Sequence, residues 1–316
     1  MRTDILTITL NPTVDFAASA PKIYPDEKLR CTEPHVDPGG GGINVARAIR
    51  LLGGQATALI AIGGGTGARL LQLLALEGVP TVAFQGPGET RQSFSITDQS
   101  TAQQYRFVMP GPSWNADDVA RGLRAVHQAA GDGTVVVLSG SQPPGVAKEF
   151  RSILAEHVTG RGARLIVDTS GPALTNLVQA PHEAIDTLRM DSAEAEELAG
   201  RPLPERDDTA AFAAGLVDKR VASNVIVARG ADGSVLSNGD GSWHAVAPRV
   251  EVVSRVGAGD SFVGAWTLAE ARGETLPECL RVAVAAASAA CTTEGTRLSD
   301  PEMTERQRAK TTLERI

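Results

Sequence analysis

The sequence predicts an α/β protein with a mostly parallel central β-sheet and a smaller sheet beside it. From residue 114 onward, short apolar runs alternate with helix-like segments, and this alternation is typical of βαβ units. Residues 16–36 and 90–109 instead show period-two alternation of apolar and polar side chains. With 316 residues, 42% of them hydrophobic, the chain can form one large domain with a small addition.

The regular elements follow from apolar runs bounded by turn residues. The charged tail after residue 299 is expected to fray. Strands are expected over 4–10, 56–62, 134–138, 164–167, 185–188 and 224–228, with a hairpin over 234–237 and 243–246. Helices are expected over 43–52, 68–77, 117–128, 148–159 and 260–272, and another opens at 189–194.

The smaller sheet is expected to combine short strands within 16–36 with a hairpin over 90–96 and 104–109, and to act as a lid. Lys28 and Arg30 are two residues apart, so in a strand they share one face and favour a phosphate clamp. A solvated edge strand is the alternative. Arg91 is a second clamp candidate, although a lone exposed arginine is more often simply solvated.

Composition excludes several classes of function. The net charge of −7 and scattered lysines provide no footprint for nucleic acid or an anionic membrane. The first ten residues are too short and polar for a signal peptide, and no later apolar run is long enough to span a bilayer, so we expect a cytoplasmic protein. The three cysteines form no C-x-x-C pair and indicate neither a disulfide framework nor a structural zinc site.

The segment 256–262, Val-Gly-Ala-Gly-Asp-Ser-Phe, is the strongest candidate for chemistry. Gly257 and Gly259 allow the backbone amides to turn toward a ligand at the start of a helix, where the helix dipole favours an anion. Asp260 can accept a proton from an attacking hydroxyl, so the segment predicts an anion hole with a base. The alternative is that Asp260 only caps the helix.

A second glycine-rich segment precedes the helix expected over 43–52. Four consecutive glycines, Gly39 to Gly42, indicate close backbone approach to a ligand or tight packing, and Asn44 in the first turn can reach a sugar hydroxyl. Neither G-x-G-x-x-G nor a Walker lysine follows. The loop 63–67 fits a loose dinucleotide fingerprint, but no acidic residue stands about 20 positions later, so a nicotinamide-dependent oxidoreductase is disfavoured.

Polar residues also follow several predicted strands, at the sheet edge where ligands bind. Asp15 is a candidate contact for substrate hydroxyls or a turn-stabilising residue, and Ser141 and Asp168 stand past later strands. Asp191 and Glu194 are three apart and share a helical face, which suits either Mg²⁺ held through water or a capping box.

Two further segments are candidates for nucleotide binding. The glycines of 229–233 either admit phosphates or turn the chain into the following hairpin. The alanine-rich segment 276–292 allows close approach of a purine ring or of a partner helix.

Together these motifs resemble the PfkB, or ribokinase-like, sugar kinases over residues 3–298. The two signatures are Pro-Gly-Gly-Gly-Gly-Ile-Asn-Val-Ala at 38–46 and Val-Gly-Ala-Gly-Asp-Ser at 256–261. Segments 23–25, 28–32, 105–111 and 295–298 resemble the family members that phosphorylate fructose 6-phosphate. Relatives acting on fructose 1-phosphate or tagatose 6-phosphate usually carry lysine where this chain has Gly41.

The resemblance implies a three-layer α/β sandwich, forming a single domain over 1–316, with a β-sheet lid made of 14–37 and 89–111. It implies ATP-dependent phosphorylation of fructose 6-phosphate at O1, with Mg²⁺ and a monovalent cation such as K⁺. It further implies homodimers that pair lid to lid, and a tetramer with ATP. Kinases of another phosphosugar and a non-catalytic sugar-phosphate sensor are the alternatives.

The resemblance also assigns roles to individual positions. Asp260 is implied as the base, with Gly257, Ala258 and Gly259 as the anion hole. Sugar and phosphate contacts are implied for Asp15, Lys28, Arg30, Gly40, Asn44, Arg91 and Ser141. Nucleotide contacts are implied for Arg189, Asp191, Ala228, Arg229, Gly230, Ala231, Asp232, Gly233, Val284 and Ser288. Metal contacts are implied for Glu194 with Mg²⁺ and for Ser254, Val256, Ala290, Thr293, Gly295 and Arg297 with the monovalent cation.

One stretch departs from the family pattern. Relatives usually read Lys-Pro-Asn where this chain has Arg189, Met190 and Asp191. Asp for Asn adds a negative charge beside the metal, and Arg for Lys replaces a point charge with a planar fork. This departure is the reason that the sensor alternative stays open.

Overall fold

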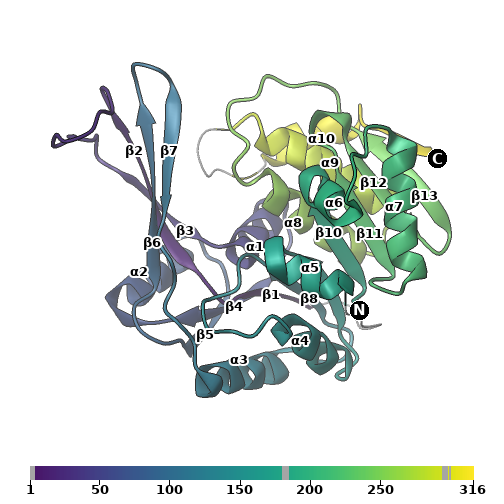
Figure 1. Ribbon diagram of the computed structural model, residues 1–316, viewed down its shortest axis with the longest axis horizontal. Helices are drawn as coiled ribbons and strands as arrows, with labels where there is room; N and C mark the ends of the chain where they lie inside the picture. The colour runs from purple at the N-terminus through teal and green to yellow at the C-terminus, as the bar shows by residue number, and fades with distance from the viewer. Residues whose placement is uncertain (1–3, 180–184, 294–297, 299) are drawn as a thin grey trace.

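The computed structural model describes residues 4–179, 185–293, 298 and 300–316, which form two sheets and the helices around them (Figure 1). The main sheet has the strand order β14-β13-β12-β11-β10-β9-β8-β1-β4-β5. Pairing is parallel from β11 to β5 and antiparallel from β11 to β14. The strands are β1 (Ile5–Thr9), β4 (Thr57–Ile62), β5 (Thr81–Gln85), β8 (Val135–Ser139), β9 (Arg164–Asp168), β10 (Thr187–Asp191), β11 (Asn224–Ala228), β12 (Ser234–Asn238), β13 (Gly241–Val246) and β14 (Thr312–Arg315).

Helices cover both faces of the main sheet and make the three-layer sandwich (Figure 1). On β8, Val136 and Leu138 pack toward α3 to α7, whereas Val135 and Val137 pack toward α1, α2, α8 and α9, because neighbouring strand residues face opposite sides. The helices are α1 (Gly41–Leu51), α2 (Gly64–Leu76), α3 (Ala116–Ala129), α4 (Phe150–Thr159), α5 (Gly171–Gln179), α6 (Ser192–Ala199), α7 (Arg206–Asp218), α8 (Ala258–Ala271), α9 (Leu276–Ala290) and α10 (Pro301–Arg308).

The small sheet stands out from one end of the molecule (Figure 1). Its strand order is β3-β2-β6-β7, with β2 parallel to β6 and the other pairs antiparallel. The strands are β2 (Thr13–Ala20), β3 (His35–Gly39), β6 (Arg91–Asp98) and β7 (Gln103–Val108). The predicted hairpin and separate sheet are therefore confirmed.

The strand order indicates where along the main sheet a ligand would bind. β1 pairs with β4 on one side and with β8 on the other, so the strand order reverses there. Crevices form at the carboxyl ends of strands at such a switch point. The chain after β1 enters the small sheet, and α1 begins beside the end of β8.

Several predicted elements are wrong in place or kind. Lys28 and Arg30 lie in irregular backbone rather than a strand, α2 already begins at Gly64 within the predicted glycine loop, and β10 extends three residues beyond the predicted 185–188. The tail does not fray, because α10 packs on α9 and β14 pairs with β13. The strand β5 and the helices α5 and α7 also escaped prediction. Among the described residues, no helix is long and apolar enough to cross a bilayer.

Candidate active site

A cleft of about 360 Å³ lies between the small sheet and the first turns of α1 and α8. Its wall combines residues far apart in sequence, from β2 and β6 on one side to the segment 255–260 on the other. Seven of the predicted site residues line it: Asp15, Gly40, Asn44, Arg91, Val256, Gly257 and Asp260. The cleft therefore unites the two glycine-rich segments with the predicted arginine.

Asp260 lies in the first turn of α8, as its third residue. Its Oδ2 accepts a hydrogen bond from Asn44 Nδ2 at 2.9 Å. Burial, with a smaller contribution from the negative charge of Asp168, raises the pKa of Asp260 to about 7 against the opposing Asn44 hydrogen bond. A carboxylate with such a pKa can take and release a proton near neutral pH.

The cap of α8 is Gly257, so the interpretation of Asp260 as an N-cap is wrong. Gly257 adopts φ 77°, a left-handed conformation that glycine accepts without steric cost. No side chain caps this helix end. The cap residue therefore contributes no side-chain acceptor to the first amides, and the positive end of the helix dipole lies at the cleft.

The four-glycine segment brings α1 against the ends of β1 and β8. A Cβ atom at Gly41 would collide with Ser139 Oγ and Gly140 N, and one at Gly42 would lie 2.5 Å from the Ile8 carbonyl oxygen. Gly40, at φ 121°, supplies the turn into the helix. Close packing therefore explains these glycines, and it places Asn44 beside Asp260.

Arg91 and Asp15 form the opposite wall. Arg91 is held by the backbone, because its Nε donates to the Asn11 carbonyl at 3.2 Å and its Nη1 to the Met109 carbonyl at 3.3 Å. Asp15 Oδ1 is buried without a hydrogen-bond partner. Burial raises the pKa of Asp15, against a hydrogen bond from Thr13 and the charge of Arg91. An unpaired buried oxygen facing a cleft suits a substrate hydroxyl.

Two arginines that sequence reasoning missed also line the cleft, namely Arg106 and Arg255. Arg106 could have been found from the predicted hairpin, in which it pairs with Ser95 and shares its face of the sheet. Ser93, Ser95 and Arg106 all line the cleft. Arg255 lies directly before the signature at 256–261 and carries no pattern of its own.

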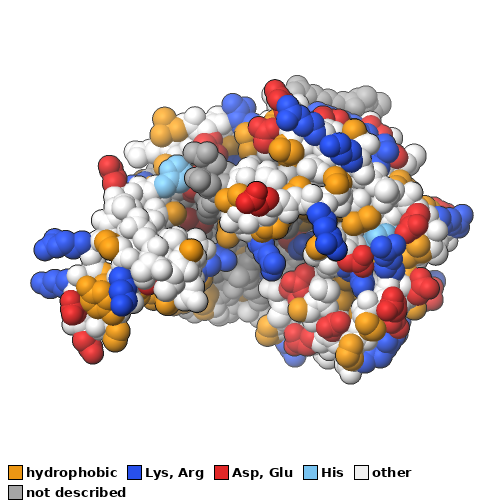
Figure 2. Space-filling model, turned by 90° about the horizontal axis from the view of Figure 1, so that it is seen from above, with side chains coloured by type: hydrophobic (Ala, Val, Ile, Leu, Met, Phe, Trp, Pro, Cys, Tyr) orange, Lys and Arg blue, Asp and Glu red, His pale blue; other side chains and the backbone are white. Residues whose placement is uncertain are grey.

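Lys28, Arg30 and Ser141 do not line the cleft. Both cations are exposed in the segment between β2 and β3. Figure 2 shows Lys and Arg side chains projecting from the outer end of the small sheet. Ser141 is connected to the cleft through Asn11, whose Nδ2 donates to Ser141 Oγ at 3.1 Å and whose carbonyl oxygen accepts from Arg91.

A second polar cluster lies at the ends of β9 and β10. Arg189 Nη1 donates to Asp168 Oδ1 at 3.0 Å, and a Cβ atom at Gly259 would stand 3.3 Å from Arg189 Nη1. The guanidinium therefore lies beside the start of α8. Ser139 Oγ donates to Asp168 Oδ2 at 3.5 Å, which connects this cluster to β8.

Asp191 and Glu194 form the capping box of α6. Asp191 Oδ1 accepts from the Glu194 amide at 2.9 Å, and Glu194 Oε2 accepts from the Asp191 amide at 2.8 Å. Burial raises the pKa of Glu194, and the charges of Asp191 and Asp168 add to the shift. Throughout the described ranges, no three His, Cys, Asp or Glu side chains converge to hold a metal directly.

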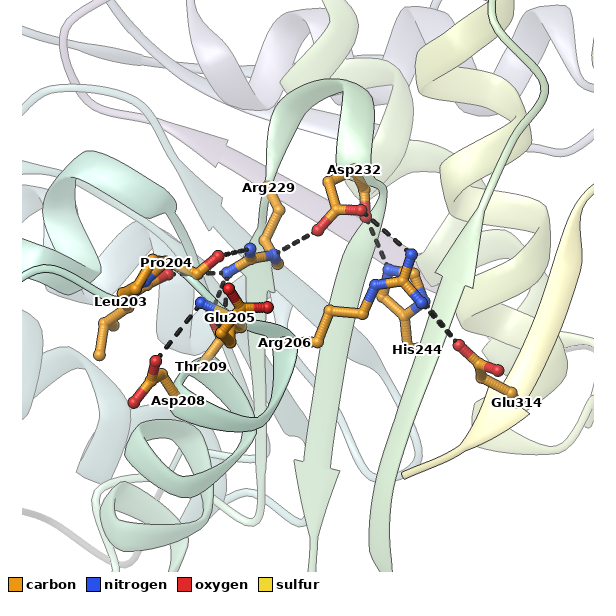
Figure 3. A network of polar contacts seen from close by, with 10 residues as sticks. All are labelled: Leu203, Pro204, Glu205, Arg206, Asp208, Thr209, Arg229, Asp232, His244 and Glu314. Atoms are coloured by element: carbon orange, nitrogen blue, oxygen red, sulfur yellow. Dashed lines mark hydrogen bonds and ion pairs between the residues drawn. The ribbon is translucent and has the colours of Figure 1, made fainter.

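The turn at 228–233 is held by its own side chains (Figure 3). Arg229 Nε pairs with Asp232 at 2.9 Å, and its Nη2 donates to the Pro204 carbonyl at 2.7 Å. Asp232 also pairs with Arg206 at 3.3 Å, and its carbonyl oxygen lies 2.6 Å from His244 Nε2. The side chains of Arg229 and Asp232, which were predicted to contact the nucleotide, thus make hydrogen bonds and ion pairs within the protein. Val284 on α9 is buried, and Ser288 on the same helix is half-buried.

The predicted monovalent-cation residues fall on two adjacent segments. The amides of Val253 and Ser254 donate to the Cys291 carbonyl at 2.9 and 3.3 Å, which places 254–256 beside 290–293. Ser254, Val256, Ala290 and Thr293 are thus brought near one another. Gly295 and Arg297 lie outside the described residues.

The three-layer core, the small sheet and the cleft define a ribokinase-like carbohydrate kinase. The chain belongs to the pfkB family carbohydrate kinases, which match residues 3–303. It is 41% identical over 302 residues to the ATP-dependent 6-phosphofructokinase isozyme 2 of Escherichia coli (strain K12), covering 96% of this chain and 97% of the relative. This membership removes the oxidoreductase interpretation of the loop at Gly63.

Solved structures of phosphofructokinase-2 from Escherichia coli have the same fold. One, in complex with potassium, superposes with a TM-score of 0.92 at 41% identity, covering 97% of this chain and 98% of that one. Another, in complex with fructose-6-phosphate, gives 0.89 at 39% identity with the same coverage. A third, the tetrameric inhibited form, gives 0.90 at 40% identity, again covering 97% and 98%.

Proposed function

We propose that the protein transfers the γ-phosphoryl group of ATP to O1 of fructose 6-phosphate. One observation carries this proposal: Asp260 and Arg91 line the same cleft, together with Asn44 on the side of Asp260 and Asp15 on the side of Arg91. A hexose phosphate needs an anion-binding end, hydroxyl partners along its length and a base at its reacting hydroxyl. The likeness to the Escherichia coli isozyme supports the same acceptor.

In the proposed reaction, Asp260 accepts the proton of O1 while O1 attacks the γ-phosphorus in line. The bond from phosphorus to the leaving oxygen of ADP breaks, and the products are fructose 1,6-bisphosphate and ADP. The amides of Gly257, Ala258 and Gly259 at the start of α8 would receive the negative charge of the transferring group. Arg189 lies beside this helix end and adds a positive charge.

The residues at the end of β10 fit Mg²⁺ held through water. Mg²⁺ keeps several waters and needs only one or two carboxylates beside the substrate phosphates. Glu194 and Asp191 would hold it, and the raised pKa of Glu194 fits a carboxyl group that gains from a nearby cation. When bound, Mg²⁺ neutralises charge on the phosphate oxygens.

The remaining predicted contacts complete the proposal. The backbone of 228–233 and the surface of α9 near Val284 and Ser288 would line the nucleotide, and Ser141 would reach the sugar through the Asn11 side of the cleft. The segments 254–256 and 290–293 would hold a monovalent cation, as the potassium complex of the Escherichia coli enzyme suggests.

We further propose a homodimer in which the small sheets pair and serve as lids, the whole chain forming one domain. Three apolar side chains at alternate positions on and just after β7 are 39–49% exposed: Tyr105, Phe107 and Met109. An exposed apolar strand face favours pairing with a second copy. Lys28 and Arg30, which miss their own cleft, would then reach the phosphate of the partner's substrate.

A panel of phosphosugars tests the acceptor. Purified protein with ATP, Mg²⁺ and K⁺ is assayed for ADP release with fructose 6-phosphate, fructose 1-phosphate and tagatose 6-phosphate. We expect the highest kcat/KM with fructose 6-phosphate. A higher value with another acceptor would replace the proposed substrate, and binding of fructose 6-phosphate without ADP release would identify a sensor.

Light scattering tests the assembly, with and without ATP and Mg²⁺. We expect dimers, tetramers when ATP is added, and monomers for Phe107→Asp, which places a charge on the apolar face. Wild-type monomers at micromolar concentration would contradict the lid-paired dimer.

A further inference from the structure

Arg47 lies one turn after Asn44 on α1, behind the cleft, with its side chain 10% exposed. Its Nη1 donates to Asn44 Oδ1 and to the Pro38 carbonyl, both at 3.2 Å. Its Nε and Nη2 grip the two carboxylate oxygens of Glu77 at 2.6 and 2.7 Å. Such a bidentate pair holds a guanidinium in one orientation.

Arg47 determines which end of the Asn44 amide faces Asp260. A guanidinium only donates hydrogen bonds, so the amide atom facing it is the oxygen. The amide nitrogen is then left to donate to Asp260 Oδ2, at 2.9 Å. A donated N–H bond is stronger to an ionised carboxylate than to a protonated carboxyl group, so this orientation of the amide favours ionised Asp260.

We propose that Arg47 is a positioning residue for proton transfer, which locks Asn44 in the orientation that donates to Asp260 and so favours its ionised, proton-accepting form. This inference rests on the proposed function, in which Asp260 is the base. Glu77 at the end of α2 anchors Arg47, and Asp37 on β3, 3.5 Å from Arg47 Nη2, joins the small sheet to the same network.

Groups from several elements face Asp260 and set its charge. Burial and the carboxylate of Asp168 on β9 disfavour ionisation, whereas Asn44, Arg189 on β10 and Arg47 favour it. Loss of Arg47 removes one positive charge and also frees the Asn44 amide to turn over. Both changes raise the pKa of Asp260, so less of the base is ionised at neutral pH.

The test compares Arg47→Met, Arg47→Lys and Glu77→Gln with Arg50→Met as the matched control. Arg50 lies on the same helix, is exposed and donates to the Glu77 carbonyl at 2.6 Å, but it contacts neither Asn44 nor Asp260. For each variant, kcat and KM are measured with fructose 6-phosphate and ATP between about pH 6 and pH 9.

We expect the acid limb of kcat for Arg47→Met to move upward by about one pH unit, which lowers kcat at pH 7 by about fivefold and restores it near pH 9. The KM for fructose 6-phosphate changes less than kcat. Arg47→Lys and Glu77→Gln give smaller shifts in the same direction, and Arg50→Met leaves the profile unchanged. An equal loss at every pH, or an equal shift in Arg50→Met, would show a purely structural role and overturn the proposal.

A measurement without turnover separates this inference from the proposed function. The carboxyl carbon of Asp260 is followed by ¹³C NMR from about pH 5 to pH 9 in wild type and Arg47→Met, with the signal assigned by its loss in Asp260→Asn. We expect a higher pKa in Arg47→Met even if fructose 6-phosphate proves not to be the acceptor. Identical titrations in the two proteins would refute the role of Arg47.

Discussion

Asp191 and Asp260 both stand at the start of a helix on the carboxyl side of the main sheet, and the structure uses them differently. Asp191 is the N-cap of α6, and its side chain accepts from the amide of Glu194. Asp260 is the third residue of α8, where Gly257 takes the cap position and leaves the carboxylate to accept from Asn44. A glycine cap therefore releases an acidic side chain for chemistry.

Asp191 and Asp260 also differ in exposure to solvent and in pKa. Asp191 is exposed, whereas burial raises the pKa of Asp260 to about 7. An exposed carboxylate in a capping box stabilises its own helix. A half-buried carboxylate that accepts a hydrogen bond from a side-chain amide stays available to a proton donor in the cleft.

The largest expected effect comes from exchanging each carboxylate for an amide. Asp260→Asn removes the proposed base and should lower kcat by about 10²- to 10⁴-fold, while fructose 6-phosphate still binds. Asp191→Asn keeps a good capping residue, so its kcat should stay within about tenfold of wild type. Steady-state kinetics and calorimetric titration measure both. An Asp260→Asn protein with more than about a tenth of wild-type kcat would not need this base.

The same pair of variants should differ in the pH dependence of stability. The folded pKa of Asp260, about 7, lies above the ordinary value of 3.8, so the stability it contributes is present below that ordinary value and is lost as pH rises through about 7. Asp260→Asn should therefore exceed wild type in unfolding free energy by up to about 4 kcal/mol at pH 8, and by little at pH 4. Asp191→Asn should follow wild type at both. Urea unfolding at the two pH values measures this, and a wild-type curve parallel to Asp260→Asn would rule out the buried, raised pKa.

The comparison also shows what the sequence can and cannot predict. The strands β8 and β9 were predictable because continuous apolar runs between turns signal buried parallel strands. The tail was not, because β14 owes its order to the edge of β13 and α10 to α9. Lys28 and Arg30 were misplaced because alternation alone does not show whether a segment has a strand to pair with.

The parts of the site that follow glycine-rich segments were predictable from the sequence. Gly40 and Gly257 bend the chain at the starts of α1 and α8, so Asn44 and Asp260 were detectable by their neighbours. Arg47 was not, because its role depends on Glu77, thirty residues later on another helix. Whether Asp260 is a cap or a base also depended on helix register, since the helix begins two residues earlier than the pattern indicated.

A smaller effect is expected from the glycine cap itself. Gly257→Ala forces alanine into φ 77° and puts its Cβ 2.9 Å from Leu298 Cδ2, which should cost about 1–2 kcal/mol of stability and lower kcat. Gly273→Ala is the matched control, because Gly273 follows α8 with φ 82° and no atom lies within 4 Å of the added Cβ. It should lose similar stability and keep its kcat. Equal kcat in the two variants would show that the conformation of Gly257 does not contribute to catalysis.

The smallest expected effect concerns the capping box. Asp191→Ala leaves the Glu194 amide without its acceptor and should cost about 1 kcal/mol, whereas Asp191→Asn should cost only a few tenths of that. If Asp191 also holds Mg²⁺ through water, both variants remove the same charge and should raise the Mg²⁺ concentration needed for half-maximal activity by the same few-fold factor. Urea unfolding and a Mg²⁺ titration of activity separate the two roles. A Mg²⁺ requirement that rises in Asp191→Ala but not in Asp191→Asn would trace the effect to the loosened helix start, and Asp191 would then be a cap alone.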